Sequence, residues 1–66
     1  NSQRDEGLQY ALAELPSVQR EIIVLRDYLD LSYAEIAEIQ EIAQGTVMSR
    51  LHRARIALKK ELTRDE

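Results

Sequence analysis

Small, hydroxyl and basic side chains gather at the start of one long predicted helix, in the order Gly45, Thr46, Ser49, His52 and Arg53. Glycine lets a partner approach the backbone closely, and a threonine beside free backbone N–H groups suits a phosphate. Serine, histidine and arginine further along can contact base edges or phosphates, and arginine is the side chain best shaped for guanine. This pattern favours non-covalent binding in the major groove of duplex DNA.

Other side chains of this helix have two interpretations each. Met48 either contacts a thymine methyl group or is an exposed residue without a partner. His52 lies one turn beyond Met48 and is either a surface histidine or a DNA contact. The basic run is either an ordinary solvated helix face or part of the binding surface. It comprises Arg50, Arg53, Arg55, Lys59 and Lys60.

No arrangement of residues in the sequence suggests catalysis or a bound cofactor. There is no nucleophile–base pair, no carboxylate dyad with a pocket and no phosphate-cradling glycine loop. Cysteine is absent and His52 is the single histidine, so the usual metal ligands are missing. We therefore expect a binding module, not an enzyme, with no cofactor and no metal.

Four helices must position these side chains. Apolar residues recur at intervals of three and four, the helical spacing, over about residues 4–14, 17–29, 33–39 and 44–62. Pro16 separates the first two helices, because proline ends one helix and fits the first turn of the next. We predict an all-α, four-helix domain, residues 1–66, whose last two helices form a C-terminal helix-turn-helix.

The apolar positions of two of these helices form the expected core. The second helix should be the most buried, and Ile56 in the fourth points away from the core, so it either packs under the first helix or belongs to a partner surface. The expected inner faces are Val18, Ile22, Ile23, Val24, Leu25 and Leu29 in the second helix, and Val47, Leu51, Ala54, Leu58 and Leu62 in the fourth.

The third helix has a clear predicted start. Ser32 and Glu35 fit the S-x-x-E capping box, in which each side chain accepts a hydrogen bond from the other residue's backbone N–H. The helix should therefore begin at Tyr33, and capping explains Ser32 and Glu35 without a functional role.

The charge of the chain is unevenly distributed. The 66 residues carry a net charge of −3, which is unusual for a nucleic-acid binder. Residues 1–43 hold three basic and nine acidic side chains, whereas residues 44–66 hold six basic and three acidic ones. A basic last helix on an acidic scaffold can steer one face of the molecule toward a polyanion.

The composition is that of a soluble globular domain, with 44% hydrophobic and 32% charged residues. No apolar run approaches the length needed to span a bilayer, and no signal-peptide pattern precedes the first helix, so we expect a cytoplasmic protein without membrane insertion. Because the chain begins at Asn1 without an initiator methionine, we interpret it as a piece of a larger protein.

These motifs together resemble region four of the sigma-70 family of RNA polymerase sigma factors, most of all the extracytoplasmic-function group. The resemblance covers roughly residues 8–62. The motifs are Leu15-Pro16-x-x-x-Arg20-Glu21, Leu25-Arg26, Leu31-Ser32-Tyr33-x-Glu35-Ile36-Ala37 and, most specific, Gly45-Thr46-Val47-x-Ser49-Arg50-Leu51-x-Arg53-Ala54-Arg55.

The resemblance implies recognition of the −35 element of duplex promoter DNA within RNA polymerase holoenzyme. It also implies docking on the flap of the polymerase β subunit. The positions that it implies for base contacts are Met48, Ser49, His52 and Arg53. The positions that it implies for phosphate contacts are Arg26, Tyr33 and Thr46, together with Arg50.

Two of the implied phosphate contacts have structural alternatives. Arg26 could pair with an acid on its own helix, and Tyr33 could serve packing only. The chain also departs from the family pattern at three positions. Met48 stands where Lys or Arg is common, Glu41 replaces the usual turn glycine, and Ala43 replaces a frequent proline.

Two other functions remain open on the sequence alone. The carboxy-terminal domain of a response regulator shares the helix-turn-helix, although Leu15-Pro16 and Ser49-Arg50-Leu51 favour the sigma family. The fragment could instead act mainly as a protein-interaction module bound by an anti-sigma factor or the β flap. The acidic first two helices and Ile56 motivate that hypothesis.

Overall fold

The computed structural model describes the backbone of residues 2–64 and the side chains of residues 6–64, and the described part contains helices and no strand. The elements are α1 (Ser2–Glu14), α2 (Ser17–Ile23), the π-helical segment η1 (Val24–Tyr28), α3 (Tyr33–Gln40) and α4 (Gln44–Leu62). The prediction of an all-α fold with a C-terminal helix-turn-helix is confirmed.

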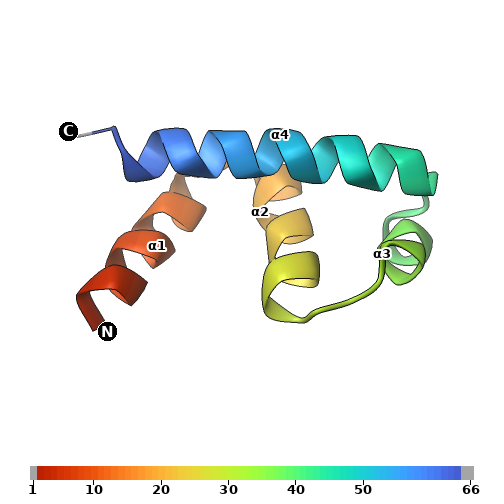
Figure 1. Ribbon diagram of the computed structural model, residues 1–66, viewed down its shortest axis with the longest axis horizontal. Helices are drawn as coiled ribbons and strands as arrows, with labels where there is room; N and C mark the ends of the chain where they lie inside the picture. Colours follow the sequence, from red (N-terminus) through yellow and green to blue (C-terminus); the bar gives the residue numbers. More distant parts are fainter. Residues whose placement is uncertain (1, 65–66) are drawn as a thin grey trace.

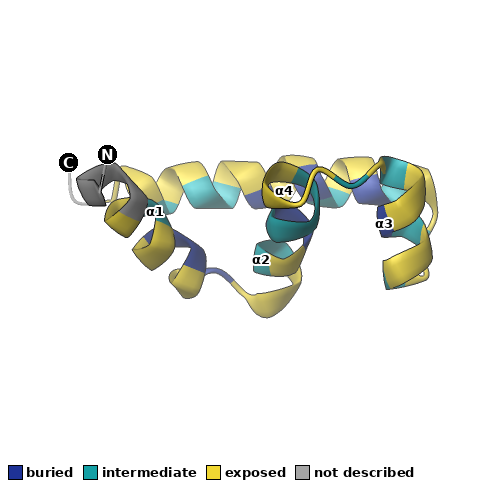
Figure 2. Ribbon diagram, turned by 90° about the horizontal axis from the view of Figure 1, so that it is seen from below, coloured by how far each residue is buried: buried dark blue, intermediate teal, exposed yellow. Residues whose placement is uncertain are grey.

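The long helix α4 organises the fold. The three shorter helices α1, α2 and α3 lie one after another along the same side of it (Figure 1), and each of them contacts it. Buried and exposed segments alternate along α4, as expected for a helix with one face in the core (Figure 2). The buried core comprises Leu12, Leu15, Ile22, Ile23, Ile36, Val47, Leu51 and Ala54.

The corner between α1 and α2 follows from Pro16, which lies between the two helices as predicted. The Arg20 guanidinium stabilises this corner, because it donates to the carbonyl oxygens of Leu15 at 3.2 Å and Ala13 at 3.4 Å. Carbonyl groups at the end of a helix lack intrahelical partners, so a side-chain donor there offsets their loss of hydration. Arg20 thus fixes the direction in which α2 leaves α1.

The prediction for the second helix was wrong in part. Its α-helical section ends at Ile23 and continues as η1, where the Leu29 N–H donates to the Val24 carbonyl at 3.0 Å. Such i→i+5 bonds widen the turn and rotate the following side chains relative to an α-helix. Leu29 is therefore 59% exposed, and η1 contains no buried residue.

Val18, Ile56 and Leu62 also lie outside the core. Val18 was expected on the buried stripe but is 53% exposed, since the core contacts of α2 come from its last turn. Leu62 was expected on the inner face of α4 but is exposed near the end of that helix. Ile56 is exposed as well, so it does not pack under α1.

The helix-turn-helix begins at the predicted capping box. The Ser32 hydroxyl accepts a hydrogen bond from the Glu35 N–H at 3.0 Å, and the Ser32 N–H donates to the Glu35 carboxylate at 2.9 Å. The α-helix starts at Tyr33 as expected. These two bonds satisfy backbone and side-chain groups that would otherwise remain unpaired at the start of α3.

The turn between α3 and α4 has a left-handed residue at Glu41, with φ 57° and ψ 48°. The Ile42 N–H donates to the Ala37 carbonyl at 3.0 Å, and the Glu41 N–H donates to the Glu38 carbonyl at 3.3 Å. This is the Schellman arrangement, whose left-handed position is usually glycine. Glu41 therefore adopts a conformation that costs a residue with a Cβ atom about 1 kcal/mol.

Replacing Glu41 should relieve this backbone strain. We expect Glu41→Gly to raise the free energy of unfolding by about 1 kcal/mol, because glycine has no steric penalty at positive φ. Denaturant titration followed by circular dichroism measures the change. Glu41→Gln is the matched control, since it removes the charge but keeps the Cβ atom. An equal gain in both variants would show that charge, not backbone strain, is the cause.

The capping box should also make stability depend on pH. Hydrogen bonds from the Ser32 backbone and side chain lower the pKa of Glu35 below its ordinary value, against a smaller opposing effect of desolvation. A carboxyl group with a lowered folded-state pKa stabilises the fold at neutral pH, and this stabilisation is lost as the pH falls through the folded-state pKa.

We therefore expect Glu35→Gln to flatten the dependence of unfolding free energy on pH in the acidic range. The measurement is a series of denaturant titrations between neutral pH and about pH 3. Glu38→Gln is the control, because Glu38 lies on the same helix outside the capping box. Identical pH profiles for the parent and Glu35→Gln would contradict the linkage.

Candidate nucleic-acid interface

The N-terminal half of α4 presents one exposed face opposite its buried one. Met48 is 55% exposed, and Ser49, His52 and Arg53 are exposed as well. On the other side of the same turns, Val47, Leu51 and Ala54 are fully buried. Packing of the inner face thus fixes the direction of the outer one. The structure brings together on this surface, which we call the recognition face, the four side chains that were expected to face bases.

The start of α4 is open to a partner. Ala43 is the N-cap residue and makes no side-chain cap, so no side chain within residues 6–64 covers the helix start in the way that Ser32 covers α3. Gly45 has no positive φ, and a Cβ atom added to it would meet nothing within 4 Å. The fold itself therefore does not require glycine at this position.

Thr46 and Ser49 are linked within the helix. Thr46 is half-buried, and its carbonyl oxygen accepts a hydrogen bond from the Ser49 hydroxyl at 3.2 Å. Because the single O–H donor of Ser49 is used inside the helix, its oxygen lone pairs are left to face outward. Ser49 in this rotamer presents an acceptor.

Arg26 and Tyr33 form a pair at the junction of η1 and α3. The guanidinium carbon of Arg26 lies 4.9 Å from the centre of the Tyr33 ring, within the range of a cation–π contact. Arg26 also donates to the Leu31 carbonyl at 2.8 Å. No ion pair to Arg26 occurs among the described residues, which contradicts the expected alternative of an acid on its own helix.

This pair leaves polar groups available at the surface. Tyr33 packs against the core, as its structural interpretation required, and Arg26 retains guanidinium N–H groups beyond the one bonded to Leu31. Both side chains are half-buried, so their positions are well defined. Arg26 lies within η1 and Tyr33 is the first residue of α3, the helix that precedes the recognition face.

Arg55 has a structural contact that the sequence did not suggest. Its guanidinium forms two hydrogen bonds with the Asp27 carboxylate, one of them from Nε to Oδ2 at 3.1 Å. The hydrogen bonds that Arg55 donates to the Asp27 carboxylate raise the pKa of Arg55, with desolvation opposing the shift. This pair ties η1 to α4 across 28 residues of sequence. No local spacing could have revealed it.

Arg50 and Arg53 lie together at the side of α4 that faces the first turn of α2. They line a groove of about 330 Å³ with Pro16, Val18 and Gln19. Arg50 is half-buried and Arg53 is exposed. The sequence predicted both arginines as site residues, but it gave no sign that α2 would lie beside them.

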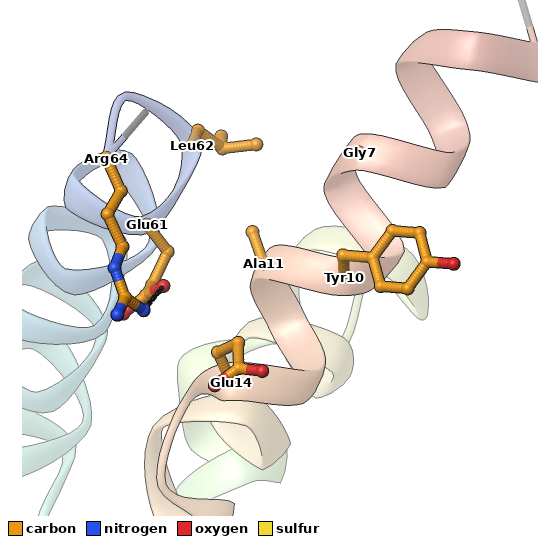
Figure 3. A pocket seen from close by; sticks show the side chains of 7 residues that line it. All are labelled: Gly7, Tyr10, Ala11, Glu14, Glu61, Leu62 and Arg64. Atoms are coloured by element: carbon orange, nitrogen blue, oxygen red, sulfur yellow. Dashed lines mark hydrogen bonds and ion pairs between the residues drawn. The ribbon is translucent and has the colours of Figure 1, made fainter. Parts of the chain in front are cut away.

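A second groove lies near the far end of α4 and differs in character. It measures about 470 Å³ between α1 and the end of α4 (Figure 3), and Arg64 within it forms an ion pair with Glu61 at 3.3 Å. Acidic and apolar groups predominate here, so this groove does not suit a polyanion. The residues that line it are Gly7, Tyr10, Ala11, Glu14, Glu61, Leu62 and Arg64.

Comparison with known proteins gives a consistent family assignment. Residues 5–58 match the family described as "Sigma-70, region 4". The RNA polymerase sigma factor YlaC of Bacillus subtilis is 39% identical over 61 residues, which are 92% of this chain and 35% of the relative. No solved structure matches the chain.

Two further relatives carry the extracytoplasmic-function designation in their names. The ECF RNA polymerase sigma factor SigW of Bacillus subtilis is 46% identical over 55 residues, 83% of this chain and 29% of the relative. The ECF RNA polymerase sigma factor SigE of Mycolicibacterium smegmatis is 41% identical over 64 residues, 97% of this chain and 25% of the relative.

The chain thus spans between a quarter and about a third of the length of these relatives. The family match includes α2 and α3 entirely, most of α1 and α4, and the whole recognition face. The predicted resemblance to region four of extracytoplasmic-function sigma factors is confirmed. The chain belongs to the sigma-70 region 4 family.

Proposed function

We propose that this domain recognises the −35 element of duplex promoter DNA and directs RNA polymerase to initiate transcription. The observation that carries the proposal is the exposed face of Met48, Ser49, His52 and Arg53, positioned by the buried face of the same helix. Membership of the sigma-70 region 4 family supports it. In this mechanism the N-terminal half of α4 enters the major groove.

Phosphate contacts hold the domain in register while base contacts select the sequence. We assign phosphate contacts to Arg26, Tyr33, Thr46 and Arg50. Arg26 and Tyr33 support each other at the start of α3, so both can meet one strand with little further ordering of their side chains. The open N-terminus of α4 adds backbone N–H groups near Thr46, and these favour an anion.

The side chain of each residue proposed to contact bases determines which base it can recognise. Arg53 can donate two hydrogen bonds to guanine, and His52 adds a polar group one turn beyond Met48. Met48 offers an apolar surface for a thymine methyl group. Ser49, whose hydroxyl already donates to Thr46, can accept from the amino group of adenine or cytosine. The array therefore includes a donor, an acceptor and an apolar group.

The partner that this function requires is RNA polymerase core, and we place its β flap at the groove between α1 and the end of α4. Tyr10 of α1 is 75% exposed, with its ring pointing away from α4, and Leu62 near the end of α4 is exposed on the other side of the groove, away from the recognition face (Figure 3). A groove that combines aromatic and aliphatic side chains with charged ones suits a protein contact. An anti-sigma factor is the other candidate for this surface.

Protein binding as the main role is the second candidate function, and the same groove supports it. The acidic first half of the chain and exposed Ile56 also favour a protein partner.

Within residues 2–64, no helix is both long and apolar enough to cross a membrane. We propose that the domain acts in the cytoplasm, where polymerase and DNA are found.

The experiment that tests the proposed function is selection from a pool of random duplexes at two salt concentrations, followed by sequencing of the retained DNA. Enrichment of one short motif would establish sequence-specific reading and identify the target. Retention that depends on salt but enriches no motif would leave only phosphate attraction. That result would favour protein binding as the main role.

Substitution of Arg53 and Lys59 should separate base reading from general attraction. We expect Arg53→Ala to weaken binding to the selected duplex by roughly 1–3 kcal/mol and to relax its sequence preference. Lys59→Ala, further along α4, should have a smaller effect that is equal on all sequences, with a shallower salt dependence. Fluorescence anisotropy with selected and random duplexes measures both. Equal losses of binding in the two variants, on both selected and random duplexes, would show that the recognition face has been assigned to the wrong residues.

Substitution of Gly45 should weaken DNA binding without destabilising the fold. A Cβ atom at this position meets nothing within the domain, so Gly45→Ala should leave the free energy of unfolding unchanged or higher. We expect the same substitution to weaken duplex binding about fivefold, or on the order of 1 kcal/mol, because the methyl group blocks close approach of the backbone to a phosphate.

Gly7→Ala is the matched control for this variant. Gly7 is also helical, and a Cβ atom added to it likewise meets nothing within 4 Å, but it lies in α1. It should leave duplex binding at the parental value. Unchanged binding by Gly45→Ala would show that the DNA backbone does not approach the start of α4 closely.

A further inference from the structure

The arginines within residues 6–64 fall into two groups according to their partners. Four of them, namely Arg20, Arg26, Arg55 and Arg64, are hydrogen bonded to a backbone carbonyl or to a carboxylate within the domain. Within residues 6–64, neither Arg50 nor Arg53 has such a bond. Both of these arginines line the groove beside the first turn of α2.

The rest of that groove consists of one amide and two apolar side chains. Gln19 is half-buried, and Val18 is 53% exposed although it is a β-branched apolar residue beside the core helix. No acidic side chain lines the groove, in a domain whose first 43 residues carry nine acids. Glu21, the acid nearest to Gln19 along the chain, is hydrogen bonded to Gln40 of α3 at 3.4 Å.

We propose that this groove binds the sugar–phosphate backbone of the duplex that α4 reads, with α2 as a second DNA-contacting element. Arg50 and Arg53 supply positive charge for a phosphate, and the Gln19 amide donates to the same phosphate or its neighbour. Val18 and Pro16 pack against the deoxyribose, which explains an apolar side chain at an exposed, basic surface. The inference rests on the proposed function and extends the contact beyond the helix-turn-helix.

The groove adjoins the recognition face, and this favours DNA as the partner that binds in the groove. Arg53 belongs both to the exposed face of α4 and to the groove, so a duplex seated on that face runs past the groove. Arginine guanidinium groups match phosphate oxygens in geometry as well as charge. An acidic protein segment would find the same charge, but it would have to bind at the surface that the duplex covers.

The test compares two variants, one with a new negative charge in the groove and one with the same charge elsewhere on the domain. Gln19→Glu places a carboxylate between the two arginines and a phosphate. Gln9→Glu makes the identical change on exposed α1 and is the control. Equilibrium binding of the 66-residue chain is measured with the selected duplex and with a random duplex of equal length. Circular dichroism and denaturant titration verify that each variant folds.

We expect Gln19→Glu to weaken binding to both duplexes by about tenfold and by equal factors, because like charges repel and phosphate contacts carry no sequence information. Gln19→Ala should weaken both about threefold through the loss of one hydrogen bond. Gln9→Glu should weaken binding to both duplexes much less than Gln19→Glu does.

The outcomes separate this inference from the proposed function. If the parent chain enriches a motif but Gln19→Glu binds like Gln9→Glu, the groove does not contact DNA and the role of α4 stands. If Gln19→Ala weakens only the selected duplex, Gln19 reads a base and the backbone assignment is wrong. If the parent chain binds no duplex, both the function and the groove assignment fail.

Discussion

Burial of the inner face of α4 is the constraint on which the rest of this structure depends. Val47, Leu51 and Ala54 are fully buried and form one core cluster with Ile22 and Ile36 from the shorter helices. Each fully buried Val, Leu or Ile side chain contributes about 1.5–3 kcal/mol, a large share of the stability of a small domain. With no cysteine in the sequence, no disulfide adds to it. The same packing that stabilises the fold therefore orients the residues that we propose for DNA contact.

Local chemistry explains which parts of the fold could be predicted from the sequence. The start of α3 depends on Ser32 and Glu35, only three residues apart, and the start of α4 on the apolar period that begins at Val47. The exposed face of α4 follows directly from that period, which is why the expected base-reading residues lie together. Such features are specified within one or two helical turns.

The features that the sequence did not reveal depend on distant parts of the chain. The π-helical turn η1 departs from the helical period and exposes Leu29, while the pairing of Asp27 with Arg55 requires the finished packing of η1 on α4. Val18 has the spacing of a core residue, yet its position beside α4 leaves it in a basic groove. A periodic pattern identifies a helix but does not say how far along the helix the core extends.

Net charge is a poor guide to the function of this domain, because the fold decides which charges are available. Arg20 donates to a backbone carbonyl at the corner between α1 and α2, and Arg55 pairs with Asp27, so both arginines stabilise the fold. Arg50 and Arg53 are left beside the recognition face, and the acids are concentrated in the first 43 residues. A chain with a net charge of −3 can thus present a cationic surface on one side. In the proposed complex, the surrounding negative charge opposes binding of DNA in other orientations and favours the approach in which α4 faces the duplex.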